Sequence, residues 1–277
     1  MDRMIKTAGI QLAPQADLSE NLAKALKLIE LAAGEGARII TLPQLFNSRW
    51  FAHAIDGRNF SLAEAEDGPA ITGLREAAAK AGSVIIAPIF EKEADSYFNT
   101  AFVIGPDGGV IGKYRKMHVP SIPLWEEKAY FKQGDKGFPV FKTPFAAIGV
   151  QLCWDVFFPE GFSALALKGA EAVFAPTASA FYHSHKKWQR AISAAAHANG
   201  LFIFRVNRVG KEEKQEFYGE SFCAGPDGEF VGEPSGSSEG VVLVDMDLSN
   251  VTRARNEWVF LRDRRPADYK ELTEIKQ

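Results

Sequence analysis

The chain has 277 residues, of which 46% are hydrophobic and 24% charged, with a net charge of −3 and an isoelectric point near 6.0. This composition is typical of a soluble globular protein, and the weakly acidic balance excludes electrostatic binding to nucleic acid. No apolar run approaches the ~20 residues of a membrane span, and the N-terminus lacks the apolar segment of a secretion signal. Two distant cysteines, Cys153 and Cys223, form neither a disulfide framework nor a zinc-ligand spacing. We therefore expect a cytoplasmic protein with a single domain, 1–277.

Strands and helices alternate along the first half of the chain. Apolar residues recur at helical spacing from Leu18 to Ala33, and short apolar runs that end at glycine or proline indicate strands. Residues 47–69 lack a clear period and predict a loop. In chain order we expect strand 5–12, helix 17–33, strand 37–42, helix 71–81, strand 84–90 and a hairpin of strands 99–104 and 110–114.

The second half opens with a loop, 115–139, and continues the same alternation. In chain order we expect strand 147–152, helix 159–168, strand 171–175, helix 188–199, strand 202–207, a hairpin of strands 217–224 and 229–232, and strand 240–247. The turns at 105–108 and 225–228 share the sequence Gly-Pro-Asp-Gly, which indicates an internal pseudo-repeat. This pattern predicts an α/β fold of two mixed sheets covered by helices.

One cysteine stands where a buried strand ends. Residues 148–152 are mostly apolar, and Cys153 opens a polar and aromatic stretch. A thiol held at a strand end can face a cleft and serve as a nucleophile. An unpaired cysteine is also often a small buried hydrophobe, and this stretch alone favours that interpretation.

Three further stretches carry side chains suited to the same chemistry. Residues 112–120 crowd cations at a strand end, where Lys116 or His118 would hold the oxyanion of an acyl transfer. Glu127 stands in a charged, aromatic loop, and Gln44 follows a buried strand. Taken singly, these stretches have simpler interpretations as a solvated basic turn, a surface loop and a structural glutamine.

Together these stretches resemble the nitrilase superfamily of carbon–nitrogen hydrolases. The matching motifs are Leu42-Pro43-x-Leu45-Phe46, Tyr114-Arg115-Lys116-x-His118, Glu127-Lys128-x-Tyr130-Phe131 and Cys153-Trp154-Asp155 with Pro159-Glu160. Within the superfamily, Trp188-Gln189-Arg190 and 262–266 with Tyr269 are similar to the N-carbamoylputrescine amidase and β-ureidopropionase branch. The resemblance implies a four-layer αββα sandwich without a metal or organic cofactor. It also implies a homodimer or higher homo-oligomer, in which the charged tail, 252–277, suits contact with a partner subunit.

The resemblance assigns a role to each matching side chain. Cys153 matches the nucleophile, and Lys116 matches the cation that stabilises the tetrahedral oxyanion. Glu127 matches an acidic residue that orients substrate and assists proton movement. Substrate contacts are expected from Trp154, whose backbone N–H would be a second oxyanion donor, and from His118, Tyr114 and Thr177.

Where the family has a glutamate as general base, this chain has Gln44. A carboxylate there takes the thiol proton, delivers it to the leaving nitrogen and later activates water, whereas an amide cannot accept that proton. Losing a positioned acid–base group typically slows a reaction by ~10²–10⁴-fold. We therefore expect very slow turnover, and we interpret Gln44 as an engineered change that traps ligand, in preference to a natural pseudoenzyme.

The expected reaction is hydrolysis of a small N-carbamoyl compound, N-carbamoylputrescine-like, with release of ammonia. An aliphatic amidase or ω-amidase is the alternative enzyme, and carbon dioxide release separates the two. A non-catalytic ligand-binding protein is the alternative of another class, and a redox role for the cysteines lacks a Cys-x-x-Cys context. The loops 47–58 and 179–187, rich in aromatic residues and His, indicate either a pocket walled by rings or ordinary loop packing, with the distal group of the substrate open.

Overall fold

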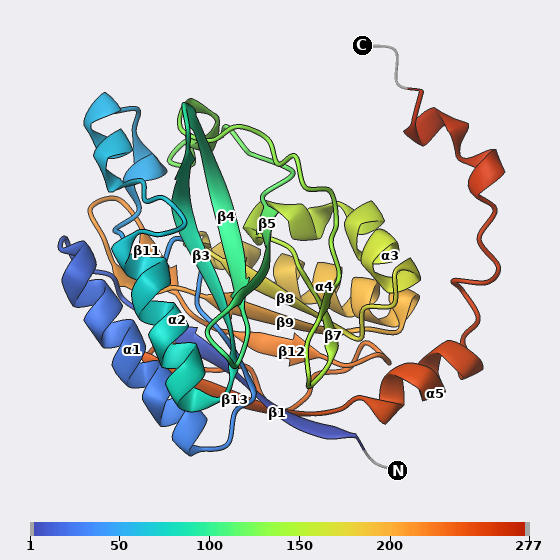
Figure 1. Ribbon diagram of the computed structural model, residues 1–277. Helices are drawn as coiled ribbons and strands as arrows, with labels where there is room; N and C mark the ends of the chain where they lie inside the picture. Colours follow the sequence, from blue (N-terminus) through green and yellow to red (C-terminus); the bar gives the residue numbers. More distant parts are fainter. Residues whose placement is uncertain (1–2, 275–277) are drawn as a thin grey trace.

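The computed structural model describes residues 3–274 and arranges them in layers of helices and sheets (Figure 1). The helices are α1 (Leu18–Gly34), α2 (Pro69–Ala81), α3 (Pro159–Leu167), α4 (His185–Asn199) and α5 (Ser249–Glu257). The strands are β1 (Met4–Gln11), β2 (Ile39–Thr41), β3 (Val84–Glu93), β4 (Ser96–Ile104), β5 (Val110–Arg115), β6 (Phe141–Lys142), β7 (Ala147–Val150), β8 (Ala172–Thr177), β9 (Phe202–Asn207), β10 (Val209–Lys211), β11 (Glu216–Tyr218), β12 (Phe222–Ala224) and β13 (Gly240–Asp247).

Two large sheets contain most of these strands. The first has the order β13-β1-β2-β3-β4-β5, and the second has the order β12-β9-β8-β7-β6. Each is mixed, because β1, β2 and β3 run parallel in the first and β7, β8 and β9 run parallel in the second, while their outer strands are antiparallel. The prediction of two mixed sheets is therefore confirmed.

The alternation of side chains along the strands builds three apolar layers. In β9, Phe202 and Phe204 point into the core between the two sheets, while Ile203 points to the helix side. Helices α1 and α2 cover the other face of the first sheet with Ile29 and Ile71. Helices α3 and α4 cover the second sheet in the same way (Figure 1). The result is the expected αββα sandwich.

The two Gly-Pro-Asp-Gly turns occupy matching places. Gly108 and Gly228 both have positive φ, +79° and +86°, which favours glycine. A Cβ at Gly108 would lie 2.8 Å from the carbonyl oxygen of Arg75 in α2, and one at Gly228 would lie 3.0 Å from that of Ser193 in α4. Each turn therefore fits closely against the helix that precedes its hairpin, as an internal pseudo-repeat requires.

Two sequence predictions were wrong in detail. The stretch predicted as one strand, 217–224, is broken by Gly219 and Glu220, which both have positive φ. Its first part pairs with β10 and its second with β9, while 229–232 contributes only an isolated bridge at Phe230.

The tail does not leave the core at residue 252. It first completes α5, in which Arg255 Nη2 donates to the carbonyl of Ala170 at 2.7 Å. The chain then extends away from the body (Figure 1), and the last part of the predicted extension, 275–277, lies outside the described residues.

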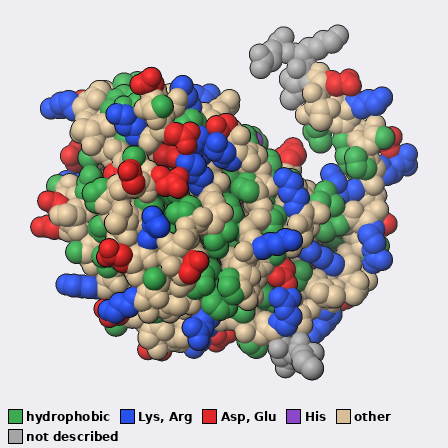
Figure 2. All heavy atoms as spheres, in the orientation of Figure 1, with side chains coloured by type: hydrophobic (Ala, Val, Ile, Leu, Met, Phe, Trp, Pro, Cys, Tyr) green, Lys and Arg blue, Asp and Glu red, His purple; other side chains and the backbone are tan. Residues whose placement is uncertain are grey.

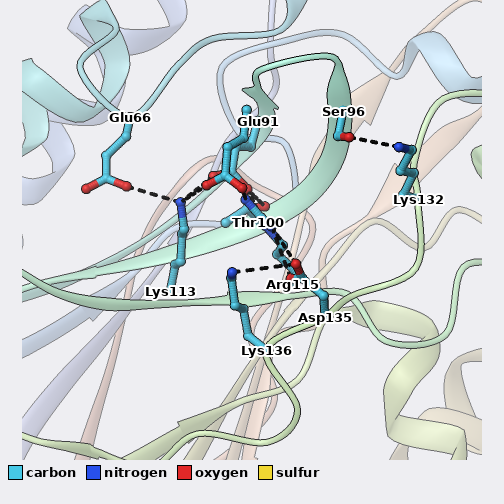
Figure 3. A network of polar contacts seen from close by, with 10 residues as sticks. Glu66, Glu91, Ser96, Thr100, Lys113, Arg115, Lys132, Asp135 and Lys136 are labelled. Atoms are coloured by element: carbon cyan, nitrogen blue, oxygen red, sulfur yellow. Dashed lines mark hydrogen bonds and ion pairs between the residues drawn. The ribbon is translucent and has the colours of Figure 1, made fainter.

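A network of charged side chains joins the far ends of β3, β4 and β5 (Figure 3). Buried Glu91 accepts from Arg115 Nε at 2.7 Å, from Lys113 Nζ at 2.7 Å and from the Thr100 hydroxyl at 2.6 Å. Arg115 also pairs with Asp135 at 3.0 Å, which ties the following loop to the sheet. Because Arg115 ends β5, the network fixes the point at which the chain enters the site.

The surface carries both signs of charge. Figure 2 shows acidic and basic side chains interspersed over the face drawn. Among the described residues, no helix combines the length and the apolarity that crossing a membrane requires.

Candidate active site

The predicted nucleophile lies beyond the carboxyl end of β7. After the strand, the chain enters a 3₁₀ turn, Cys153–Phe157, in which Cys153 has a left-handed backbone with φ of +50°. That conformation costs a residue other than glycine roughly 1–2 kcal/mol. The turn holds Sγ against the end of β8, 3.9 Å from the carbonyl oxygen of Ala178. The thiol is thus placed by backbone geometry at the edge of the second sheet.

Asp155 fastens this turn to the segment that follows β5. Its buried carboxylate accepts from the backbone N–H of Leu152 at 3.0 Å and of His118 at 2.8 Å. The hydroxyl of Tyr114 also donates to it at 2.8 Å. Because Lys116 lies between Tyr114 and His118, these bonds hold the segment that bears the cation against the turn that bears the thiol.

Lys116 and Glu127 form an ion pair that is fully buried. Nζ lies 2.8 Å and 2.6 Å from the two carboxylate oxygens, and both side chains are 0% exposed. Two amides flank the carboxylate, since Gln44 Nε2 and Asn99 Nδ2 each lie 3.4 Å from Glu127 Oε2. Gln44 Oε1 is buried without a hydrogen-bond partner in the described part of the chain.

Burial and charge act in opposite directions on these groups. Burial raises the pKa of the Cys153 thiol, and the ammonium of Lys116 opposes that rise by favouring the thiolate. Burial likewise raises the pKa of Glu127 against the effect of Lys116. Burial would lower the pKa of Lys116, but the acidic groups around it, chiefly Glu127, together outweigh burial and raise that pKa. The site therefore contains a charged ammonium beside a thiol that keeps its proton at neutral pH.

A cavity of about 330 Å³ adjoins the thiol, and both Cys153 and Glu127 line it. Its remaining walls are mainly apolar and aromatic: Pro120, Ile122, Trp125, Trp154, Phe157, Ala178, Phe181 and Trp188, with Ser179, Ser184 and Lys187 as the polar members. Cavities of about 430 and 460 Å³ lie between α1 and α2 and beside residues 48–62, and the thiol lines neither.

The four predicted catalytic residues lie in one cluster. Gln44 contacts Glu127, Glu127 contacts Lys116, and Glu127 shares the cavity wall with Cys153. Trp154 also lines the cavity, and its contact with substrate stays a prediction.

The other predicted substrate contacts are engaged elsewhere. His118 binds Asp155 and stacks on Phe158, with 3.6 Å between ring centroids. The hydroxyl of Thr177 donates to the carbonyl of Ala175 at 2.8 Å, and that of Tyr114 donates to Asp155. None of the three lines the cavity, so their contact with substrate stays a prediction.

Of the two loops expected around the pocket, one contributes. Phe181 belongs to the 179–187 loop and lines the cavity. Trp50 and Phe51 of the 47–58 loop do not line the cavity but are buried in the apolar cluster that contains its wall residues Trp125 and Ala178. The 47–58 loop therefore supports the cavity wall from behind, and its contact with substrate stays a prediction.

Three residues of the site were missed by reasoning from sequence. Asp155 belongs to the nucleophile motif, so its position two residues after the thiol was the available signal. Asn99 lies within the strand pattern of β4, and no feature of the sequence marks it as a site residue. Ser179, whose hydroxyl lies 3.0 Å from that of Tyr218, follows β8 at the same sheet edge as Cys153.

Comparison with known proteins agrees with this geometry. A family model described as carbon-nitrogen hydrolase matches residues 6–256. The chain belongs to this family. It is 38% identical to N-carbamoylputrescine amidase of Solanum lycopersicum, over 98% of this chain and 95% of the relative. It is 33% identical to beta-ureidopropionase of Arabidopsis thaliana, over 94% of this chain and 69% of the relative.

A solved structure extends the likeness to the fold. The carbon-nitrogen hydrolase from Helicobacter pylori G27 superposes with a TM-score of 0.95 at 31% identity, covering 99% of this chain and 100% of that one. The resemblance drawn from the motifs is therefore confirmed, and the chain is a hydrolase of carbon–nitrogen bonds in amides or carbamoyl groups.

Proposed function

We propose that this carbon-nitrogen hydrolase is built to cleave small N-carbamoyl compounds through an acyl-enzyme on Cys153. The observation that carries the proposal is the shared cavity, whose mainly apolar walls include both the thiol of Cys153 and Glu127, the carboxylate partner of Lys116. The N-carbamoyl class is supported by similarity to an N-carbamoylputrescine amidase and a beta-ureidopropionase. Because the names of these two relatives specify different N-carbamoyl compounds, similarity does not identify the distal group of the substrate.

In the proposed reaction, Cys153 Sγ attacks the carbamoyl carbon. The carbonyl oxygen becomes an oxyanion beside the ammonium of Lys116 and the backbone N–H of Trp154. The C–N bond to the terminal nitrogen breaks, and ammonia leaves with the thiol proton. Water then cleaves the thioester, which regenerates the thiol and releases a carbamate that decomposes to an amine and carbon dioxide.

The proposed reaction needs a group that carries protons, and Gln44 cannot serve as one. The amide of Gln44 can hold a substrate N–H with its unpaired Oε1, but it cannot carry a proton. A carboxylate at position 44 would lie about as close to Glu127 as the present amide. Repulsion between the two carboxylates would raise the pKa of the carboxylate at position 44 toward neutrality. Such a group could accept the thiol proton and return it.

The test is Gln44→Glu. We expect the variant to hydrolyse N-carbamoyl compounds at least ~10²-fold faster than the chain as it stands. Ammonia and carbon dioxide are measured together, because an amide substrate gives ammonia alone. A variant that stays inert on ureido compounds and amides would end the enzymatic proposal, and ammonia without carbon dioxide would point to an amidase. Full activity of the unchanged chain would remove the role assigned to position 44.

A further inference from the structure

Among the residues that the structure describes, no carboxylate contacts the buried cation of Arg205. Arg205 lies in β9 and is 1% exposed. Its Nη1 donates to the carbonyl of Glu220 at 3.1 Å and its Nη2 donates to the hydroxyl of Tyr218 at 3.0 Å. The guanidinium lies over the ring of Trp188, 4.8 Å from its centroid, and Nε has no partner within residues 3–274. The other buried arginines, Arg115 and Arg208, each pair with a carboxylate.

A chain of hydroxyls leads from this cation to the cavity. The hydroxyl of Tyr218 accepts a hydrogen bond from Arg205, so it can donate its own hydrogen to the hydroxyl of Ser179, 3.0 Å away. Ser179 then has its proton left to donate. Because Ser179 lines the cavity, this Arg205–Tyr218–Ser179 relay offers the cavity a hydrogen-bond donor backed by a positive charge.

The charges around the cavity favour an anionic ligand. Glu127 is the acidic side chain that lines it, and Lys116 already pairs with that carboxylate. Lys187 adds an exposed ammonium to the wall. Burial lowers the pKa of Arg205, and the neighbouring Tyr218, Cys153 and Glu220 oppose this effect. An anion in the cavity would offset the cost of the buried guanidinium.

We propose that the Arg205–Tyr218–Ser179 relay binds the distal carboxylate of the substrate, so that this chain acts on N-carbamoyl acids in preference to N-carbamoyl amines. The inference rests on the proposed function and narrows it. Ser179 directly follows Ala178, whose carbonyl oxygen lies 3.9 Å from Sγ. Since Ser179 adjoins the residue that contacts Sγ, and consecutive Cα atoms are about 3.8 Å apart, we expect a short spacer between the carbamoyl group and the carboxylate.

Three ureido compounds of equal length test the proposal: 3-ureidopropionate, propylurea and aminoethylurea. They differ only in ending with a carboxylate, a methyl group or an ammonium group. Their affinities are measured by calorimetry on the unchanged chain, and kcat/KM is measured on Gln44→Glu. We expect 3-ureidopropionate to bind at least about tenfold more tightly than either analogue, the advantage typical of one hydrogen bond to a charged group.

Two mild variants locate the effect. Ser179→Ala and Tyr218→Phe should each remove about tenfold of the acid's advantage while leaving propylurea unchanged. Ser184→Ala is the matched control, because this cavity serine donates to the carbonyl of Phe181 and is not part of the relay. It should keep the ratio of acid to propylurea.

The outcomes separate the two proposals. Equal or tighter binding of aminoethylurea, or an acid advantage that survives in Ser179→Ala, overturns the relay. Hydrolysis of all three compounds by Gln44→Glu without preference overturns the relay and leaves the proposed function standing. Relay-dependent binding of the acid without hydrolysis by Gln44→Glu supports the relay and overturns the enzymatic proposal. If no ureido compound binds, both fall.

Discussion

Cys153 experiences two opposing influences. Its burial disfavours the thiolate, while Lys116 on the neighbouring segment favours it. That Cys153 and Lys116 belong to one site was predictable from sequence, because each stands in a recognisable motif at a strand end. The tie through Asp155 and the buried guanidinium of Arg205 were not, since each depends on contacts between segments far apart in the chain. Sequence order alone cannot show which strand ends meet.

The first residue-scale prediction concerns the pH dependence of alkylation. Since burial raises the pKa of Cys153, the unchanged chain should react slowly with iodoacetamide at neutral pH, and the rate should climb as pH rises beyond the ordinary thiol range. Peptide mass spectrometry follows the reaction. Cys223 serves as the internal control, because burial raises its pKa without a cation beside it, so it should react more slowly still. Rapid modification of Cys153 at pH 7 would show that the pKa of its thiol is not raised.

The same shift has a consequence for stability. A thiol whose pKa is higher in the folded than in the unfolded state binds its proton more tightly when folded. The stabilisation is complete below the ordinary thiol pKa and is lost as pH rises through the raised value. Lys116 behaves in the same way at higher pH, because its folded-state pKa also lies above the ordinary value. The free energy of unfolding should therefore fall on the alkaline side.

The strands and helices themselves were largely predictable. Strands β9 and β13 and the start of β3 fall where the apolar pattern places them, because alternation and glycine or proline boundaries are local signals. The stretch 217–224 was mispredicted because its break consists of two positive-φ residues, one of them Glu220, which composition does not mark. Helix α5 was missed because its sequence is polar apart from a few positions such as Val251.

The charged network of Figure 3 gives a prediction at this scale. Glu91→Gln should lower the free energy of unfolding by about 2–3 kcal/mol, because it removes a buried carboxylate from Arg115 and Lys113. The cost stays below that of an isolated buried pair, since Arg115 keeps Asp135. Glu93→Gln is the matched control, because its carboxylate is half exposed and should matter little. Equal effects in urea unfolding would show that burial is not what matters at Glu91.

At the scale of the whole molecule, the segment after α5 exposes large apolar side chains to solvent. Four large apolar side chains, Trp258, Phe260, Tyr269 and Leu272, are between 42% and 60% exposed. A groove of about 370 Å³ separates the tail from α3, with Tyr269 and Leu272 on one side and Leu167 on the other. We propose that a second copy of the chain covers this surface, as expected for the C-terminal extension.

The corresponding prediction is a change in assembly. The full chain should be at least a dimer by light scattering at micromolar concentration, and a double change of Tyr269→Ser with Leu272→Ser should weaken that dimer at least about tenfold. Ile55→Ser is the control, because Ile55 is 73% exposed in the distant 47–58 loop. A monomeric full chain, or equal loss of assembly in the control, would refute the role of the tail.

The site takes its parts from both sheets of the sandwich. Cys153 follows a strand of one, while Lys116 and Gln44 follow strands of the other, and the apolar layer between the sheets sets their separation together with the hydrogen bonds of Asp155. A slight sliding of one sheet over the other would pull the sulfur away from its ammonium without unfolding either. Substitutions deep in that layer, such as at Val150 or Phe174, should therefore impair catalysis before they melt the protein. In this architecture the packing of the two sheets against each other would determine how well the proposed catalytic groups are aligned.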